Sequence, residues 1–140
     1  LLTASFRAGC AFTKSYVGYV HAVAHSLGGA YNVAHGYANA VILPVVLRAY
    51  GSAVYPRLAR LAQAAGLAGP GADSRTAALA FLDGLDGLKA RCGIGNAIPE
   101  LRPEDIPELA RHADREANPL YPVPVLMDAG ELEKIYRRLL

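Results

Sequence analysis

The stretch HAVAHSLGGAYNVAH, residues 21–35, places three of the chain's four histidines among alanine, glycine and other small or apolar residues. Its two adjacent glycines are a stop signal for a helix, and Asn32 favours a turn. We therefore expect one helix over residues 17–29, a turn, and a further helix that begins near His35. The arrangement of these two helices decides where the histidines lie.

Helical patterns continue on both sides of this stretch. Apolar residues recur at helical spacing in residues 1–12, 54–65 and 79–85. Pro44 should kink the helix that begins near His35, because proline removes one backbone donor and clashes with the preceding turn. Alternating runs of β-branched and aromatic residues, which would predict a sheet, are absent. The sequence therefore predicts an all-α fold.

Turn and capping residues divide the second half of the chain. Residues 66–72, with three glycines and a proline, predict a loop, after which Asp73 or the serine that follows it can cap a helix. Pro103 suits the first turn of another helix. Three prolines in residues 118–127 predict an extended strap, and Asp128 then begins a capping-box pattern for a last helix.

Composition limits the classes of protein to consider. With 140 residues, 53% of them hydrophobic, the chain suits one compact domain that spans residues 1–140. Its 14 basic and 12 acidic residues are scattered, so nucleic acid is not an expected partner. The longest apolar run is interrupted by Asn39 and Pro44, and no signal peptide or membrane span is predicted. Cys10 and Cys92 show no CxxC spacing and suit a reduced, cytoplasmic compartment.

The three histidines allow two interpretations. His21 and His25 are four residues apart, so they project from the same face of a helix, and His35 can return to that face after the turn. A single histidine in such surroundings is often a core residue with both nitrogens hydrogen-bonded. Three of them leave several ring nitrogens to satisfy, and a divalent metal would satisfy them, because neutral imidazole is a common ligand.

The metal site predicted in this way is incomplete. No acidic residue lies among the histidines, and none precedes Asp73. Metals usually take at least three protein ligands, so the remaining ligands are expected upstream of Leu1. The chain also begins without methionine, inside an apolar helical pattern, which suggests a fragment of a longer protein.

The run AGCAFTKSYVGYVHAVAHSLGGAYNVAHGYANAVILP, residues 8–44, resembles the C-terminal domain of the iron-containing (group III) alcohol dehydrogenases. It contains AGxAF, HAxAHxLGG and HGxANAxxLP in the order and spacing of that family. Weaker similarity continues to ANPLYPVP, residues 117–124, which is similar to a strap near the C-terminus of many members. Lys14 departs from the asparagine common in the family.

The resemblance implies a particular fold and site. The fold is the multi-helix C-terminal domain of the dehydroquinate synthase-like group, and an N-terminal nucleotide-binding domain, which holds NAD or NADP, lies outside this chain. His21 and His35 match two ligands of a divalent metal, iron or alternatively zinc, and an Asp and a His from a preceding segment complete the set. His25 matches a catalytic position that contacts the nicotinamide cofactor and the substrate. Phe12 matches a position in the substrate pocket, although core packing is the other interpretation.

The function implied is hydride transfer between an alcohol and NAD(P), with the metal polarising the substrate oxygen. The full-length protein is expected to form a homo-oligomer, and this chain alone is expected to be inactive. A maleylacetate reductase, a glycerol dehydrogenase-like enzyme and a non-catalytic helical interaction module are the alternatives, because fold does not fix reaction. His112, on a charged helix, is expected to be a solvated surface residue.

Overall fold

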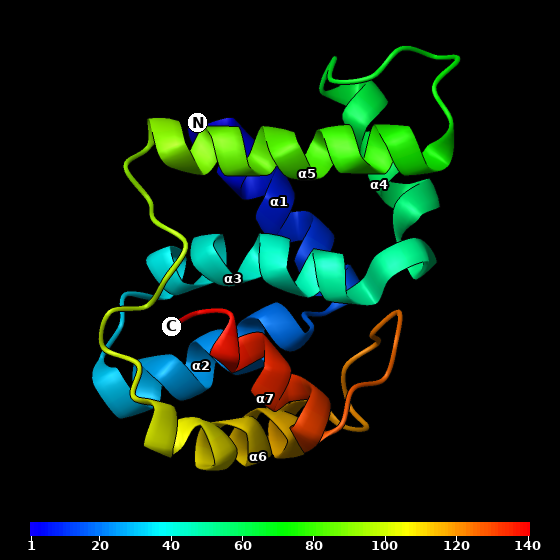
Figure 1. Cartoon of the computed structure of the whole chain (residues 1–140). Helices are drawn as coiled ribbons and strands as arrows, with labels where there is room; N and C mark the ends of the chain where they lie inside the picture. The colour runs from blue at the N-terminus through cyan, green and yellow to red at the C-terminus, as the bar shows by residue number, and fades with distance from the viewer.

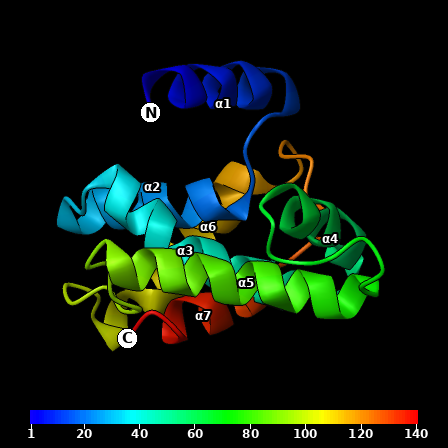
Figure 2. The same ribbon diagram turned by 90° about the horizontal axis from the view of Figure 1, so that it is seen from above.

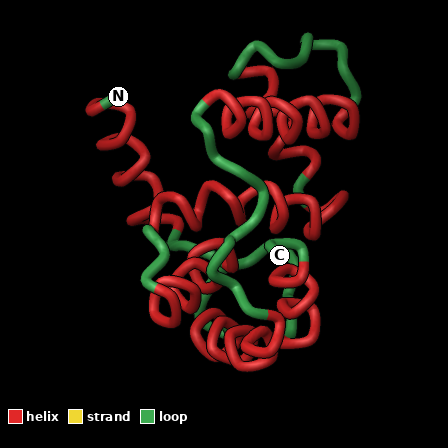
Figure 3. Tube along the Cα trace, turned by 60° about the vertical axis from the view of Figure 1, so that its left-hand side comes forward, coloured by secondary structure: helices red, strands yellow, loops and turns green.

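The computed structural model describes residues 1–140 and consists of helices and loops, so the predicted all-α fold is confirmed (Figure 3). Two short 3-10 turns, η1 (Gly51–Ala53) and η2 (Pro103–Asp105), precede the fourth and sixth helices. The α-helices are α1 (Leu2–Ser15), α2 (Tyr19–Tyr31), α3 (His35–Tyr50), α4 (Tyr55–Ala64), α5 (Ser74–Arg91), α6 (Ile106–Ala117) and α7 (Ala129–Arg137).

The helices lie on two sides of α3 (Figure 1). The α4–α5 hairpin lies on one side, and α2, α6 and α7 lie on the other. One hydrophobic core of 26 buried residues joins the two sides. Burying a large apolar side chain stabilises the fold by about 1.5–3 kcal/mol, so this core holds α2 and α3 firmly. Its largest fully buried members include Tyr19, Leu27, Ile42, Leu132 and Tyr136.

The connection between α2 and α3 is short because α2 ends in a left-handed residue. Asn32 has a φ of 56°, and its backbone N–H donates to the carbonyl oxygen of Gly28. Asparagine tolerates this conformation better than most residues. The chain enters α3 at His35, and α3 continues past Pro44 to Tyr50. The predicted helix–turn–helix arrangement is confirmed.

The α4–α5 hairpin is closed by local contacts. The Asp73 carboxylate caps α5, accepting hydrogen bonds from the N–H groups of Arg75 at 3.0 Å and Thr76 at 3.1 Å. Gly84 lets the preceding loop approach α5, because a Cβ at this position would lie 2.6 Å from Cδ1 of Leu67. A separate small cluster of buried alanines lies between the two helices, made of Ala59, Ala62 and Ala77.

The start of α6 differs from the prediction. Pro103 lies in η2, and α6 begins at Ile106 with Pro107 in its first turn. A helix that began at Pro103 would place Pro107 one full turn inside it. There, Pro107 would have no N–H to donate and its ring would clash with the carbonyl of Pro103. Because a proline is tolerated only in the first turn, Pro107 fixes the later start.

The strap between α6 and α7 is non-helical, as predicted, but turns and bends interrupt it, so it is not extended throughout. The capping box after it is confirmed. Asp128 accepts a hydrogen bond from the N–H of Glu131 at 2.8 Å and donates its own N–H to Oε2 of Glu131 at 3.1 Å. The two ends of the strap meet at Tyr19, whose hydroxyl donates to Oδ1 of Asn118 and accepts from the N–H of Met127. The strap is therefore tied to α2.

The first helix stands apart from the others (Figure 2). The helix predicted over residues 1–12 is confirmed as α1, but none of its residues is buried. Leu2 and Phe12, which share its apolar face, are 88% and 53% exposed. A helical stripe shows which side chains line up and does not specify what they contact.

Two further observations concern the surface. Cys10 and Cys92 are both exposed and form no disulfide. No helix of the chain combines the length and the apolar composition that crossing a membrane requires.

Candidate functional site

The helix α2 has one face in the core and presents two histidines on another. Val23 and Leu27 are fully buried, with no exposed surface. His21 and His25 are one turn apart and project away from that core, with the side chain of His25 44% exposed. The packing of α2 therefore fixes the direction in which both imidazoles point.

The turn at Asn32 brings the third histidine to the first two. The ring centroid of His35 lies 5.4 Å from that of His21 and 5.4 Å from that of His25. The rings of His21 and His25 are 5.9 Å apart. We call these three residues the histidine cluster. The structure thus assembles all three histidines of the stretch that the sequence singled out.

Burial and the neighbouring rings favour the neutral form of His21. Burial, followed by the charges that His35 and His25 carry when protonated, lowers the pKa of His21 below its ordinary value. The hydrogen bonds of the cluster are made by the other two rings, so the nitrogens of His21 stay unbonded. A neutral imidazole with a free lone pair is the form that binds a metal.

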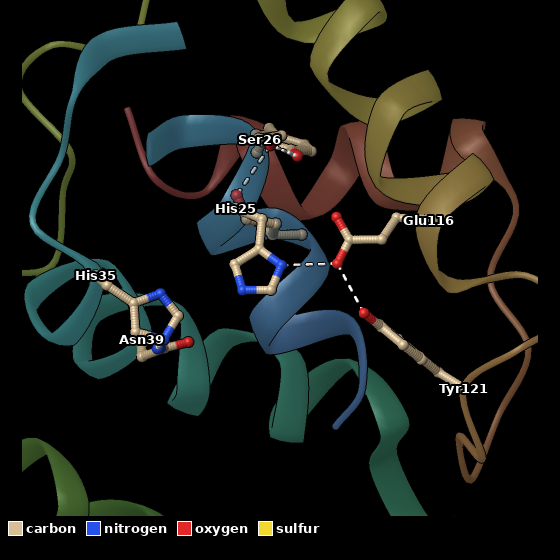
Figure 4. Close-up of polar contacts among 8 residues, drawn as sticks. His25, Ser26, His35, Asn39, Glu116 and Tyr121 are labelled. Atoms are coloured by element: carbon tan, nitrogen blue, oxygen red, sulfur yellow. Dashed lines mark hydrogen bonds and ion pairs between the residues drawn. The ribbon is translucent and has the colours of Figure 1, made fainter. Parts of the chain in front are cut away.

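Sequence reasoning missed an acidic residue that reaches the cluster. Oε1 of Glu116, on α6, lies 2.7 Å from Nδ1 of His25 and accepts a hydrogen bond from the hydroxyl of Tyr121 at 2.8 Å (Figure 4). Burial and the hydrogen bond to Glu116 raise the pKa of Tyr121 to about 12. His25 and Glu116 are 91 positions apart, so local spacing carried no signal of the pair. A carboxylate on a helix with many charged residues normally lies on the face that is exposed to solvent.

His35 has a partner within its own helix. Nδ2 of Asn39 donates a hydrogen bond to Nε2 of His35 at 2.8 Å (Figure 4). Oδ1 of Asn39 is buried and has no hydrogen-bond partner. If the side-chain amide of Asn39 were turned over, its Oδ1 would accept a hydrogen bond from an Nε2–H of His35. Nδ1 of His35 would then be free to bind a metal ion.

Two hollows border the histidine cluster. A groove of about 480 Å³ is lined by Phe12, His21, Asn39, Tyr50 and Val123, among others. The structure therefore brings Phe12 to the same hollow as His21.

The second hollow is a groove of about 740 Å³ between α2 and α6, lined in part by His25, Ser26, Tyr31 and Glu116. His25 thus opens onto a different groove from the one that His21 lines. His112, also on α6, is 52% exposed and pairs only with Glu108, at 3.8 Å, which confirms it as a solvated surface residue.

Comparison with known proteins agrees with the resemblance of residues 8–44. The model of the Fe-containing alcohol dehydrogenase family, C-terminal part, matches residues 1–140. The chain belongs to this family. The expected fold of the Fe-containing alcohol dehydrogenases is confirmed, with the histidine cluster on helices of the C-terminal part.

Individual members of the Fe-containing alcohol dehydrogenase family show how far the similarity extends. The 1,3-propanediol dehydrogenase of Citrobacter freundii is 35% identical over 137 residues, which cover 96% of this chain and 35% of that protein. Lactaldehyde reductase of Escherichia coli K12 is 34% identical over 108 residues, covering 76% of this chain and 28% of that protein.

A solved alcohol dehydrogenase from Oenococcus oeni superposes with a TM-score of 0.85 at 32% sequence identity. The superposition covers 95% of this chain and 35% of that one. The chain spans about a third of the length of the curated relatives it matches, such as the 35% of the Citrobacter protein.

The donor set of this Fe-containing alcohol dehydrogenase chain is compatible with a divalent metal. Imidazole nitrogens are ligands that both iron and zinc accept. His21 offers unbonded ring nitrogens, and His35 lies beside an amide whose oxygen is unpartnered. No group of three or more His, Cys, Asp or Glu side chains is placed to hold an ion by itself. His21 and His35 therefore fit the role of two members of a larger ligand set.

Proposed function

We propose that the whole protein is an NAD(P)-dependent alcohol dehydrogenase and that this chain is its metal-binding part. One observation carries the proposal: the imidazoles of His21 and His35, from successive helices, converge to a centroid distance of 5.4 Å beside a groove. Membership of the family supports the interconversion of an alcohol with an aldehyde or ketone. Relatives named for 1,3-propanediol and lactaldehyde support a small substrate.

His21 and His35 are the residues that would hold a divalent metal, iron or alternatively zinc. An Asp and a His from another part of the protein would complete the ligand set. When bound, the metal would polarise the substrate oxygen as a Lewis acid. The lowered pKa of His21 supports this role, because it keeps the imidazole in the neutral form that metals bind.

His25 and Phe12 would act on the substrate and cofactor. His25 lies beside the two ligands and would orient the substrate hydroxyl or relay its proton, next to the nicotinamide of NAD or NADP. Phe12 would shape the apolar side of the substrate pocket, since it lines the groove that also contains His21. The cofactor would be bound mainly by an N-terminal nucleotide-binding domain.

Assembly and location follow from the same proposal. The full-length protein would be a cytoplasmic homo-oligomer that binds neither nucleic acid nor membrane. The formal net charge of +2, from scattered basic and acidic residues, supports the absence of a nucleic-acid surface. Two free thiols support a reduced compartment.

The decisive test is the metal content of the full-length protein. Wild-type protein and a His112→Ala control should each contain about one divalent ion per chain, and a His21→Ala, His35→Ala double variant should lose it. Elemental analysis identifies the ion, and a panel of alcohols with NAD and NADP identifies the reaction. Wild-type metal content in the double variant would refute the proposal.

A further inference from the structure

Glu116 connects three separate parts of the molecule through one oxygen atom. Its Oε1 contacts Nδ1 of His25 on α2 at 2.7 Å and the hydroxyl of Tyr121 on the strap at 2.8 Å (Figure 4). The carboxylate itself comes from α6, and its side chain is 32% exposed. None of these three residues is among the expected metal ligands.

The chemistry of these contacts fixes the position of a proton. An ionised carboxylate only accepts hydrogen bonds, so both partners of Oε1 must be donors. Nδ1 of His25 therefore carries a hydrogen. In a neutral imidazole with its hydrogen on Nδ1, the other nitrogen, Nε2, is an acceptor.

We propose that Glu116, steadied by Tyr121, is a positioning residue that holds His25 with its hydrogen on Nδ1 and presents Nε2 as an acceptor to the hydroxyl of the alcohol substrate. This proposal rests on the proposed dehydrogenase function. In Figure 4 the Nδ1 edge of His25 faces Glu116, and the opposite edge faces the side where His35 lies. The rings of His25 and His35 are 21° from parallel.

Tyr121 is well placed to keep Glu116 in one orientation. The backbone N–H of Tyr121 donates to the carbonyl oxygen of Ala117 at 2.8 Å, so the strap leaves α6 in a defined direction. Asn118 holds the strap further, because its amide donates to Oδ1 of Asp114 and to the carbonyl oxygen of Met127. The second donor on Oε1 is therefore itself anchored.

His25 needs such a partner because its ring is not held by packing alone. Its side chain is 44% exposed, so without Glu116 the ring could rotate and its hydrogen could move to Nε2. Nε2 would then be a donor and would no longer accept a hydrogen bond from the substrate hydroxyl. Small errors in the placement of a group that contacts substrate reduce the rate strongly.

The contact could instead serve only to tie α2 to α6. A single, partly exposed hydrogen bond contributes little to stability, so the two roles have different consequences. A structural tie would affect the melting temperature first, whereas a positioning residue affects turnover in a protein whose stability and metal content are unchanged.

The experiment compares four variants of the full-length protein. Glu116→Ala removes the acceptor, Glu116→Gln keeps an acceptor oxygen without the charge, and Tyr121→Phe removes the second donor. Glu133→Ala is the matched control, because Glu133 on α7 is 31% exposed and pairs only with Arg137 on the same helix. Each variant is assayed for metal content, melting temperature, kcat and KM.

We expect Glu116→Ala to lower kcat/KM by about 10- to 100-fold with metal content unchanged. Glu116→Gln should retain most of the activity, since its amide oxygen still accepts from Nδ1. Tyr121→Phe should show a smaller loss than Glu116→Ala, and Glu133→Ala should match the wild type. The proposal is overturned if Glu116→Ala keeps wild-type kcat/KM, or if Glu116→Gln is as impaired as Glu116→Ala.

A spectroscopic measurement tests the proton position without any activity assay. In the metal-free full-length protein, 15N chemical shifts of the His25 ring should show the hydrogen on Nδ1 in the wild type and in Glu116→Gln, and a mixture of tautomers in Glu116→Ala. A wild-type ring with a hydrogen on Nε2, alone or together with the one on Nδ1, would overturn the proposal, because Nε2 would then be a donor. If the wild type bound no metal and oxidised no alcohol, the dehydrogenase function would fail, while these shifts would still decide whether Glu116 fixes His25.

Discussion

The part of the molecule around the histidine cluster and the α4–α5 hairpin are held together in different ways. Helices α2, α3, α6 and α7 share a core that contains most of the large buried side chains. The hairpin reaches this core through Leu58 and Leu82, but the cluster between its own two helices consists of three alanines. Alanines let helices approach closely, whereas interlocking large side chains also fix how each helix is rotated.

This difference matters because the rotation of α2 determines where its histidines point. A buried hydroxyl adds polar contacts to the large side chains of this part. The hydroxyl of Tyr136 on α7 donates to the carbonyl oxygen of Leu109 on α6 and contacts Ser26 on α2. Burial raises the pKa of Tyr136, so it stays protonated and able to donate. The imidazoles are thus placed on the more completely specified part of the fold.

The largest expected effect comes from removing a large side chain of the main core. Leu132→Ala on α7 should lower the free energy of unfolding by about 2–5 kcal/mol, because it leaves a cavity in a close-packed interior. Leu132 has no exposed surface, whereas Leu79 on α5 is 41% exposed and serves as the control. Urea unfolding followed by far-UV circular dichroism measures both. Equal losses for Leu132→Ala and Leu79→Ala would contradict the close packing of Leu132 in the core.

A smaller effect is expected where the buried polar contacts are broken. Tyr19→Phe removes the hydroxyl that joins α2 to both ends of the strap, leaving groups of Asn118 and Met127 without a partner. An unsatisfied buried group costs about 1–3 kcal/mol, so the free energy of unfolding should fall by this amount. Tyr55→Phe on α4 is the control, since Tyr55 is only partly buried against the same core. A change no larger than that of the control would show that these contacts do not fix the strap.

The features that sequence predicted are those with local causes. Helix periodicity and turn signals placed His21, His25 and His35 on two consecutive helices, and a short turn was enough to bring them together. Asp73 and Asp128 were identified as caps because a cap contacts residues only two or three positions away. The strap was predicted from its prolines, because proline disrupts a helix.

The site residues that sequence did not predict depend on contacts between distant segments. Glu116 and Tyr121 reach His25 only because α6 packs against α2, and nothing near residue 116 indicates which helix its face will meet. The later start of α6 has a local cause, since Pro107 excludes a start at Pro103, and a strict reading of both prolines could have found it. The roles of His21, His25, His35 and Phe12 stay predictions until the variants are measured.

The smallest effect concerns the α4–α5 hairpin and depends on pH. Hydrogen bonds from Thr76, the side-chain bond before the backbone one, lower the pKa of Asp73 below its ordinary value of 3.8. Asp73 therefore loses its proton more easily in the folded state than in the unfolded state, and its ionised form stabilises the fold. Its contribution is fully present above pH 3.8 and is lost as the pH falls through the lower pKa of the folded state.

Asp73→Asn separates this titration from capping itself, because asparagine caps a helix about as well and does not titrate. The stability advantage of wild type over Asp73→Asn should shrink as the pH falls below 3.8. Amide exchange at Arg75 and Thr76, compared between the two proteins at each pH, locates the change in the first turn of α5. Exchange in α2 should be the same in both proteins, because no contact of Asp73 reaches that helix. A pH-independent difference between the proteins would mean that the charge of Asp73 does not stabilise the first turn of α5.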